Sequence, residues 1–242
     1  MPKKLTPIYV FTFPAPVWKT IVDEKGTCLF LELRDAKSQT VRFAALNLSS
    51  GELLWDDFTL AISEGWPTLH CANDQYLIFQ VFTDTHNPEK KAYYAIEIST
   101  QQLIQPKTQP SIRNLIDRQN NQKNTNRQNN GFLQPFFYSE DQPYFATVAS
   151  FIESLGLTRP VGGCEYAEHD NFICIAYYVP GKPAKSSGLA NYLLILDQQG
   201  GILLHECLEA SVPQIGLGIF FIAKNQLIVV QHQRQLVSYA LS

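Results

Sequence analysis

Charge, long apolar runs and patterned cysteines are scarce in this sequence. Only 17% of its 242 residues are charged, and the formal net charge is −3. Nucleic-acid-binding domains normally carry a basic stripe, so we expect no nucleic-acid partner. No apolar run approaches the ~20 residues of a membrane-spanning helix, so we expect no membrane segment. The five cysteines lack the spacing of a disulfide framework, which favours a reducing compartment, the cytoplasm, over export.

Motifs for catalysis and for cofactors are also missing. The sequence has no Gly-x-Ser-x-Gly, no phosphate-binding glycine loop and no His-Glu-x-x-His. Cys164, His169 and Cys174 have the spacing of the last three ligands of a zinc knuckle, but Val161 stands where the first cysteine should be. Because a structural zinc site needs four ligands, we expect no metal. We also expect no cofactor, and a non-enzymatic role is favoured over an enzymatic one.

What the sequence does contain is a repeat. Four polar turns each precede a run of β-branched or aromatic residues, and the first aliphatic residues of these runs are Leu29, Leu77, Ile173 and Leu227. The middle interval is twice the first, so one unit is disguised. A unit of about 48 residues with four short antiparallel strands has the size of a β-propeller blade. The sequence therefore predicts a mainly β, single-domain propeller over 1–242 with about five blades; a two-sheet sandwich is the alternative.

The disguised unit lies between residues 105 and 163. We expect a mobile loop over the Asn/Gln-rich segment 106–131, because so polar a tract cannot bury enough surface to offset the cost of ordering. Apolar residues at helical spacing predict one helix near 144–156. At the chain ends, the strand-like Pro7–Phe13 is expected to pair beside Gln235–Leu241 and to close the ring, since an open edge strand invites aggregation.

Two resemblances accompany the repeat. Ala45–Trp55 resembles one quinoprotein-type propeller repeat: a strand, an Asp or Asn, a turn ending in Gly and a strand ending in Trp. Trp55-Asp56 is also the dipeptide of the WD40 repeat class. Most of the chain is similar to an uncharacterised bacterial, Bacteroidetes-type family of domains of unknown function. The stretches that carry this similarity are Glu32–Asp35, Gly65-Trp66, Phe145–Gly156, Ala190–Leu193 and Gly218–Ile222. The resemblance implies a propeller-like fold and implies no activity, quinone or calcium.

Ionic residues beside apolar runs are the first candidates for a ligand-binding site. Glu32 and Arg34 lie on one face of an expected strand, with Arg42 nearby in the same hairpin. Ionic side chains in such a run are costly unless they pair, so they either hold a small polar ligand or form a structural ion pair, which is the favoured interpretation. Asp84 and His86 lie in an expected hairpin loop, either at a functional face or on ordinary polar surface.

Three classes of function remain open. The first is a non-enzymatic protein-interaction or scaffold module, since no catalytic motif is present and exposed aromatic residues are expected at 136–138. The second is a small-molecule or carbohydrate binder, although the three tryptophans are confined to the first quarter of the chain. The third is a glycoside hydrolase-like enzyme, with Glu32, Asp84 and Glu165 as its carboxylates.

Overall fold

The chain is mainly β and divides into two compact units. The computed structural model describes residues 4–62, 65–84, 87, 89–104, 110–121, 128–129, 132–181 and 188–242. The central unit is Phe13–Phe132, and the terminal unit combines Met1–Thr12 with Leu133–Ser242. In the described part of the chain, no helix is both long and apolar enough to cross a membrane.

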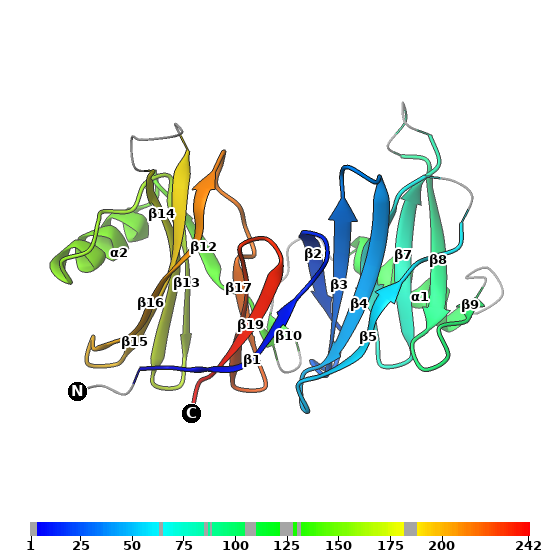
Figure 1. The fold of residues 1–242 in the computed structure, drawn as a ribbon, viewed down its shortest axis with the longest axis horizontal. Helices are drawn as coiled ribbons and strands as arrows, with labels where there is room; N and C mark the ends of the chain where they lie inside the picture. Colours follow the sequence, from blue (N-terminus) through cyan, green and yellow to red (C-terminus); the bar gives the residue numbers. More distant parts are fainter. Residues whose placement is uncertain are drawn as a thin grey trace. The chain divides into compact units, whose positions relative to one another are not determined.

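The central unit contains two four-stranded antiparallel sheets, in the orders β2-β3-β4-β5 and β6-β7-β8-β9 (Figure 1). The strands of the first sheet are β2 Val17–Val22, β3 Cys28–Asp35, β4 Thr40–Asn47 and β5 Glu52–Phe58. Those of the second are β6 Pro67–Ala72, β7 Tyr76–Phe82, β8 Lys91–Glu97 and β9 Leu103–Ile104. Helix α1, Pro110–Asn121, follows the second sheet in the chain.

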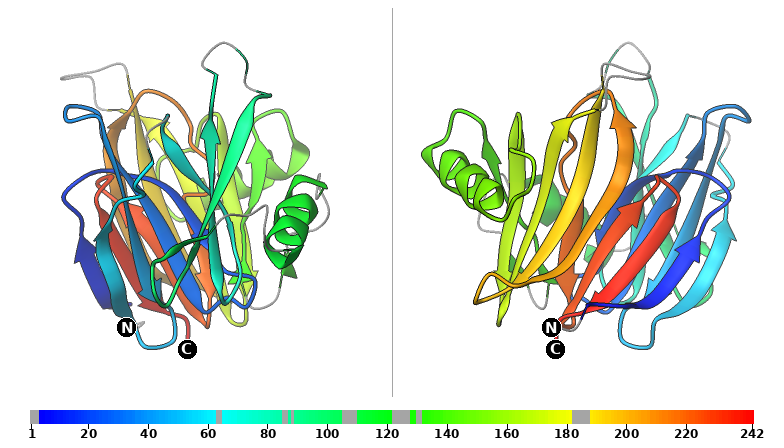
Figure 2. Two further views of the ribbon diagram at one scale, coloured as in Figure 1. Left: turned by 90° about the vertical axis from the view of Figure 1, so that its right-hand side faces the viewer. Right: turned by 60° about the vertical axis from the view of Figure 1, so that its left-hand side comes forward.

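The remaining strands form a five-stranded sheet, β12-β13-β14-β15-β16, and a sheet in the order β1-β19-β18-β17-β11-β10 (Figure 1). The five-stranded sheet consists of β12 Phe136–Ser139, β13 Gly163–His169, β14 Phe172–Pro180, β15 Leu189–Asp197 and β16 Ile202–Val212. The other consists of β1 Pro7–Thr12, β10 Gln128–Asn129, β11 Phe132–Leu133, β17 Phe220–Ala223, β18 Gln226–Gln231 and β19 Gln235–Ala240. Helix α2, Pro143–Ser154, lies beside β12 (Figure 2).

The single closed five-bladed propeller predicted from the repeat is wrong. The described residues form four separate antiparallel sheets, none of them closed. The described part of residues 105–163, where the disguised unit was expected, builds no sheet of its own. Strands β10 to β12 are short and extend other sheets, and two helices account for most of the rest that is described. The reason is the pattern of apolar residues there, which recur at helical spacing and are better buried by helices than by strands.

Two local predictions at and near the chain ends are confirmed. β1 pairs antiparallel with β19, with Val10 opposite Val237 (Figure 2), although there is no ring for this pair to close. The expected helix near 144–156 is α2, which begins with proline in its first turn and buries Phe145, Ala149 and Ile152.

The Asn/Gln-rich segment 106–131 differs from the loop that its composition predicts. Residues Pro110–Asn121 are helical, and Ile112, Leu115 and Ile116 bury one face of α1 against the sheet of β6 to β9. These residues follow one another at i, i+3 and i+4, which gives the helix an apolar stripe that the average composition of the segment conceals. The parts of the expected loop at 106–109, 122–127 and 130–131 lie outside the described residues.

The polar turns of the repeat are built by side chains that bind their own backbone. Asn47 Oδ1 accepts hydrogen bonds from the backbone N–H groups of Ser49 and Ser50, at 2.8 and 3.1 Å. Asp197 Oδ1 does the same at the end of β15, from Gln199 and Gly201 at 2.9 and 2.7 Å. Asn and Asp suit such turns because a short side chain can cap the local N–H groups.

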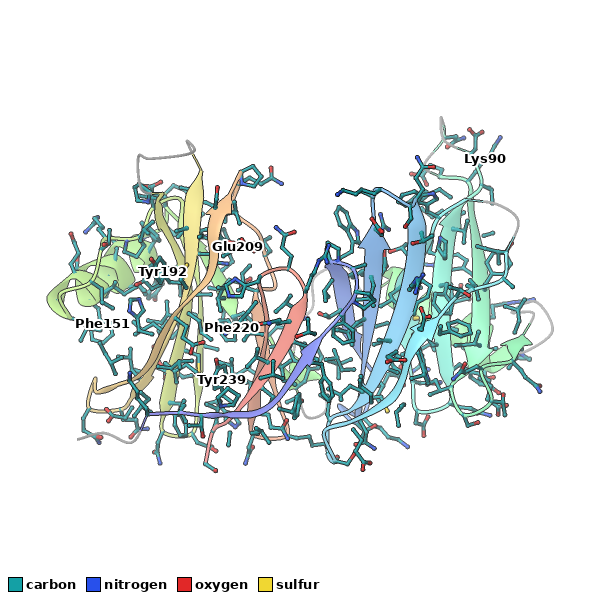
Figure 3. All side chains as sticks on the ribbon, in the orientation of Figure 1. Lys90, Phe151, Tyr192, Glu209, Phe220 and Tyr239 are labelled. Atoms are coloured by element: carbon teal, nitrogen blue, oxygen red, sulfur yellow. The ribbon has the colours of Figure 1, made fainter. Side chains whose placement is uncertain are left out.

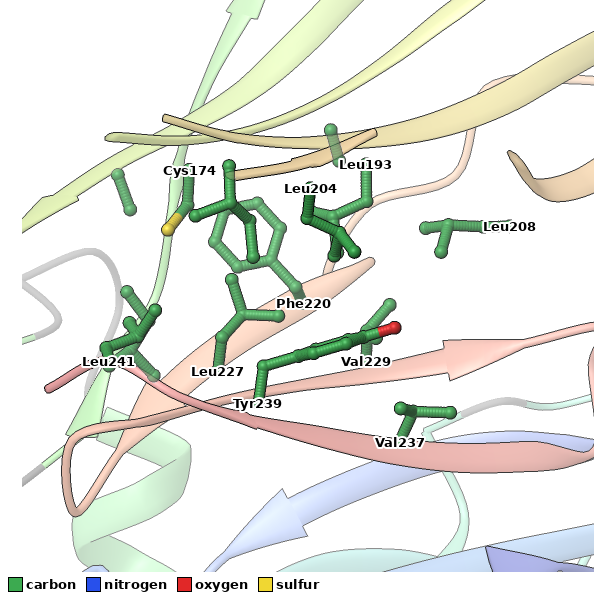
Figure 4. Close-up of a cluster of buried hydrophobic side chains, with 14 residues drawn as sticks. Cys174, Leu193, Leu204, Leu208, Phe220, Leu227, Val229, Val237, Tyr239 and Leu241 are labelled. Atoms are coloured by element: carbon green, nitrogen blue, oxygen red, sulfur yellow. The ribbon is translucent and has the colours of Figure 1, made fainter. Parts of the chain in front are cut away.

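Each unit has an apolar core between its two sheets. In the central unit, Phe43 and Phe79 meet edge to face at 4.7 Å between ring centroids. In the terminal unit, Phe220 and Tyr239 pack against Leu204 and Leu193 from the facing sheet (Figure 4). Inner strands such as β3 are buried on both faces, which explains why their sequences lose the alternation of a half-exposed strand.

Candidate functional site

The carboxylate of Glu32 lies on β3 and is completely buried. One oxygen, Oε1, accepts from Arg34 Nε at 2.6 Å and lies 2.6 Å from Arg34 Nη2. The other, Oε2, accepts from Thr68 Oγ1 at 2.8 Å and from the backbone N–H of Leu69 at 2.9 Å. A buried carboxylate is tolerated only with such partners. Because Thr68 and Leu69 belong to β6, Glu32 joins the two sheets of the unit.

Lys19 completes this junction from the neighbouring strand. It lies opposite Glu32 in the pairing of β2 with β3, and its Nζ donates to the carbonyl oxygen of Leu69 at 2.6 Å. Burial lowers the pKa of Lys19, and the Glu32 carboxylate opposes that shift. Glu32 and Lys19 therefore hold both the N–H and the C=O of one residue in β6.

Two exposed tryptophans flank the guanidinium that Glu32 holds. The Arg34 Cζ atom lies 4.7 Å from the ring centroid of Trp18 and 5.7 Å from that of Trp66. Trp18 is 65% exposed and Trp66 is 44% exposed, whereas the Arg34 side chain is only 22% exposed. Both distances are within the range of cation–π contacts. We call Trp18, Arg34 and Trp66 the tryptophan–arginine surface.

Irregular backbone places each indole. Between Val17, opposite Leu33, and Lys19, opposite Glu32, the register shifts by one residue, so Trp18 is the extra residue of a β-bulge. Bulges re-aim side chains in this way and are frequent beside functional sites.

Trp66 follows Gly65, whose φ is +67°. A Cβ at Gly65 would lie 2.7 Å from Val81 Cγ1 and 2.8 Å from the Phe82 carbonyl oxygen. Only glycine accepts both the left-handed conformation and this close approach. Gly65 therefore lets the chain pass close to the end of β7 immediately before Trp66.

A third exposed aromatic residue lies beside Trp66. Pro67 pairs with Val81, which puts Phe82 next to Trp66 at the same end of the β6–β7 pair. Phe82 is 42% exposed, and Lys91 Nζ lies 5.8 Å from its ring centroid. An aromatic ring with a cation over it thus continues the tryptophan–arginine surface.

Of the residues predicted as a site, the structure brings together Glu32 and Arg34. Arg42 instead forms an exposed ion pair with Asp57 at 2.7 Å. Asp84 pairs with Lys90 at 3.1 Å, in the β7–β8 hairpin whose Lys90 is labelled in Figure 3. His86 lies outside the described residues. The favoured interpretation of Glu32 and Arg34 as a structural ion pair agrees with this geometry: both residues lie on β3, and Glu32 reaches β6 through Thr68 and Leu69.

The tryptophans, Lys19 and Lys91 were not among the predicted site residues. The sequence did hold one signal for Trp66, which directly follows a glycine and precedes Pro67 at the start of a strand. For Trp18 the deciding feature is the bulge, and a one-residue shift of register leaves no mark in a hydrophobic pattern.

The terminal unit joins its sheets from corresponding positions but with other residues. β14 corresponds to β3 in its pairing. Cys28, the first residue of β3, pairs with Asn47 at the end of β4, and Phe172, the first residue of β14, pairs with Asp197 at the end of β15. Ala176 and Tyr178 occupy the fifth and seventh positions of β14, where β3 has Glu32 and Arg34. The carboxylate comes instead from Glu165, opposite Ala176 on β13.

Glu165 is almost fully buried, and its oxygens accept the backbone N–H groups of Gly218 and Ile219, the second at 2.8 Å. These residues precede β17 in the other sheet of the unit. The Tyr178 hydroxyl adds a bond from the N–H of Gly216 at 2.9 Å. The terminal unit therefore also has a buried carboxylate at its junction, in a part of the chain that contains no tryptophan.

The side chains considered for metal binding or hydrolysis are buried or are bonded to other described residues. Cys164 and Cys174 are not opposite each other in the β13–β14 pair, and burial raises the pKa of both thiols to about 12. His169 Nε2 lies 3.1 Å from Asn225 Oδ1. Within the described ranges, no group of three or more His, Cys, Asp or Glu residues could hold a metal ion. The carboxylates of Glu32 and Glu165 are each bonded to backbone N–H groups of their own unit.

Comparison with known proteins adds a family match over the central unit. A family model described as a domain of unknown function, DUF4905, matches residues 22–104. The matched segment includes Glu32, Arg34 and Trp66 and ends before α1. The expected similarity to an uncharacterised domain is confirmed over this part of the chain, whereas propeller repeats of the quinoprotein or WD40 type are not.

The remaining comparisons are weak. No curated protein matches the chain. One solved structure, of a member of the DUF4221 family from Bacteroides vulgatus ATCC 8482, aligns with 11% identity and a TM-score of 0.18. The alignment covers 91% of this chain and 61% of that chain. A similarity of this size supports no argument about fold or function.

Proposed function

We propose that the chain is a non-enzymatic protein-interaction module and that the tryptophan–arginine surface is its binding face. The observation that carries the proposal is the exposure of Trp18 and Trp66 on either side of an arginine that is itself held in place. Tryptophan and arginine are among the residues most enriched at the energetic centres of protein interfaces. Contiguous aromatic exposure on a soluble domain commonly marks an interaction site.

The comparison between the two units supports a role beyond folding. Glu165 also provides a buried carboxylate that joins the sheets of the terminal unit, with Ala176 and Tyr178 at the corresponding positions of the next strand. The terminal unit contains no tryptophan, so a junction of this kind does not require Trp18 or Trp66. Their presence in the central unit is better explained by what the surface binds.

The arrangement is also organised before any partner arrives. Arg34 is fixed by Glu32, and Glu32 is fixed by Thr68 and by the backbone of Leu69. Side chains that are already ordered lose little conformational entropy on binding, which leaves more of the contact energy as affinity. The five free cysteines support the cytoplasm as the place where the module acts.

A cross-linking comparison tests this function. The wild-type protein and a Trp18→Ala/Trp66→Ala variant would be cross-linked in native lysate, and any captured protein would then be purified and titrated against both. We expect a partner whose affinity falls at least about a hundredfold in the double variant. A Leu54→Ala/Leu103→Ala variant, which removes two exposed leucines elsewhere in the central unit, should bind like the wild type. Equal affinity of the wild type and the tryptophan variant for every captured protein would refute the proposal.

A carbohydrate or small-molecule ligand is the second candidate, because exposed indole rings also suit stacking on the apolar face of a sugar. A glycan array separates the two candidates. Binding of a defined glycan that is lost in the Trp18→Ala/Trp66→Ala variant, with no protein partner captured, would favour the carbohydrate.

A further inference from the structure

We infer that the tryptophan–arginine surface and its extension bind an acidic, hydrophobic protein segment: carboxylates of the partner meet Arg34 and Lys91, and its apolar side chains lie on Trp18, Trp66 and Phe82. This inference rests on the proposed function and specifies the chemistry of the partner. Four features of the site support it.

The first feature is that the Glu32 carboxylate already accepts hydrogen bonds on both of its oxygens. Both oxygens of Glu32 are occupied, one by Arg34 and the other by Thr68 and the N–H of Leu69. A carboxylate that is saturated and completely buried has no lone pair to offer a cationic ligand. Glu32 therefore offers no counter-charge to a basic partner.

The second feature is that Arg34 has hydrogen-bond donors that Glu32 does not engage. Glu32 engages Nε and Nη2 of Arg34, and within the described residues Arg34 Nη1 has no hydrogen-bond partner. The guanidinium carries five N–H donors and cannot lose its charge at ordinary pH. Nη1 therefore keeps two donors for a carboxylate, between two indoles that reduce its contact with water.

The third feature is a second cation without a carboxylate. Lys91 lies over Phe82, and no ion pair of Lys91 is found in the part of the chain that the structure describes. The neighbouring Lys90 is already paired with Asp84. Two cations, Arg34 and Lys91, thus lie among exposed aromatic rings, and the Glu32 carboxylate that binds Arg34 is buried in the junction.

The fourth feature is the alternation of ring and cation along the surface. Trp18, Arg34 and Trp66 are followed by Phe82 and Lys91 at the same end of the two sheets. A protein segment that mixes acidic and hydrophobic residues satisfies both kinds of group at once. Nucleic acid would supply anions too, but the chain's net charge of −3 disfavours a polyanion of that density.

Peptide probes test the inference directly. The probe is a short, acetylated and amidated peptide that alternates Glu with Phe, labelled for fluorescence anisotropy; the matched peptides carry Gln or Lys in place of every Glu. We expect the Glu peptide to bind the full-length protein at least about tenfold more tightly than the Gln peptide and to weaken as salt is added. The Lys peptide should bind more weakly than the Gln peptide.

Variants then assign the binding to this surface. Trp18→Ala should weaken the Glu peptide at least about tenfold, and Lys91→Gln should weaken it several-fold. Arg34→Lys keeps a cation for Glu32 but gives up the planar donor pair, so it should also weaken binding. Lys25→Gln, at the other end of β2 and β3, and Leu54→Ala are the controls, and neither should change the affinity.

The outcomes separate the inference from the proposed function. If the Glu peptide binds no better than the Gln peptide, or equally well to Trp18→Ala, the acidic-segment inference is wrong. If oligogalacturonate, an acidic sugar polymer, binds in a Trp18-dependent way while the Glu peptide does not, the ligand is a sugar acid and the inference is also wrong. In either case a protein captured by the wild type and lost in the Trp18→Ala/Trp66→Ala variant would leave the proposed function standing.

Discussion

In the central unit the carboxylate at the sheet junction comes from β3, whereas in the terminal unit it comes from β13, one strand earlier. Glu32 faces Lys19 across the β2–β3 pair, and Glu165 faces Ala176 across the β13–β14 pair. Both carboxylates bind backbone N–H groups at the start of the adjoining sheet.

The comparison separates what the fold needs from what has been added. A buried acceptor at the junction occurs in both units, so it belongs to the architecture. The two exposed tryptophans, the arginine between them and the bulge that places Trp18 are features of the central junction, and the terminal unit contains no tryptophan. They are the part of the junction that is free to serve recognition.

Removal of Glu32 should cause the largest loss of stability. Glu32→Ala leaves the charges of Lys19 and Arg34 without their buried counter-charge and leaves the N–H of Leu69 without an acceptor. Breaking a buried ion pair by removing one partner costs about 3–5 kcal/mol. Urea denaturation of the full chain, followed by circular dichroism, measures the change. A loss below about 1 kcal/mol would show that the junction does not depend on this carboxylate.

The corresponding change in the terminal unit should cost less. Glu165→Ala leaves the N–H groups of Gly218 and Ile219 without this acceptor. Glu32→Ala, by comparison, also leaves the charged side chains of Arg34 and Lys19 without their counter-charge. Two unsatisfied backbone donors, partly rescued by water, cost on the order of 2 kcal/mol. The same denaturation experiment ranks the two variants. A larger loss of stability for Glu165→Ala than for Glu32→Ala would contradict the prediction that the central junction depends more strongly on its carboxylate.

The strands and turns could be predicted from sequence because they depend on local pattern. Runs such as Leu29–Leu33 predict buried strands, and Asn47 and Asp197 mark equivalent turns through their own backbone bonds. The number of sheets could not be predicted from the repeat. Dividing the chain length by the repeat length gives the number of units only if every unit has the same fold. In residues 105–163 the interval was long enough for one more unit, but Ile112, Leu115 and Ile116 have helical spacing and form α1.

Only the charged part of the candidate site could be predicted from the sequence. Glu32 and Arg34 stand out as charges beside an apolar run, and their side chains do meet. Trp18 gains its role from a one-residue shift of register, and Trp66 from the sheet against which it lies. Neither relation is local in the chain, so composition and periodicity do not contain it.

Glycine positions next to the two junctions offer a finer comparison. Gly65 and Gly218 both have positive φ, at +67° and +71°. A Cβ at Gly65 would contact Val81 and the Phe82 carbonyl within 2.8 Å, whereas a Cβ at Gly218 would meet nothing within 4 Å. Gly218→Ala should therefore cost only the backbone strain of about 1 kcal/mol, and Gly65→Ala about 2 kcal/mol.

Gly65→Ala should also move Trp66 and weaken the Glu peptide of the binding assay, which Gly218→Ala should leave unchanged. Thermal denaturation and fluorescence anisotropy on the same two variants give both results. Equal stability and equal affinity for the two would mean that the close approach at Gly65 does not position Trp66.

The smallest expected effect is the change in stability that His70 causes at low pH. Burial, and then the charges of Lys19 and Lys91, lower the pKa of His70 in the central unit to about 4. Because the neutral form is favoured in the folded state, this histidine's contribution to stability is complete above the unfolded pKa of about 6.5 and is lost as the pH falls from there towards about 4. The ring is only partly buried, so solvent screening limits the contribution to on the order of 1 kcal/mol.

His70→Phe keeps a ring against Tyr93, whose centroid lies 5.0 Å from that of His70. The variant should flatten the decline of Tm between pH 7 and about pH 4. It should not lower Tm at pH 7, because Nε2 of His70 has no hydrogen-bond partner among the described residues. Burial also lowers the pKa of His205 in the terminal unit, but its Nε2 lies 2.9 Å from the Tyr177 hydroxyl. His205→Phe should therefore flatten the acid decline and also lower Tm at pH 7. A steeper acid decline in His70→Phe than in the wild type would show that His70 gains a proton on folding, contrary to the direction of its pKa shift.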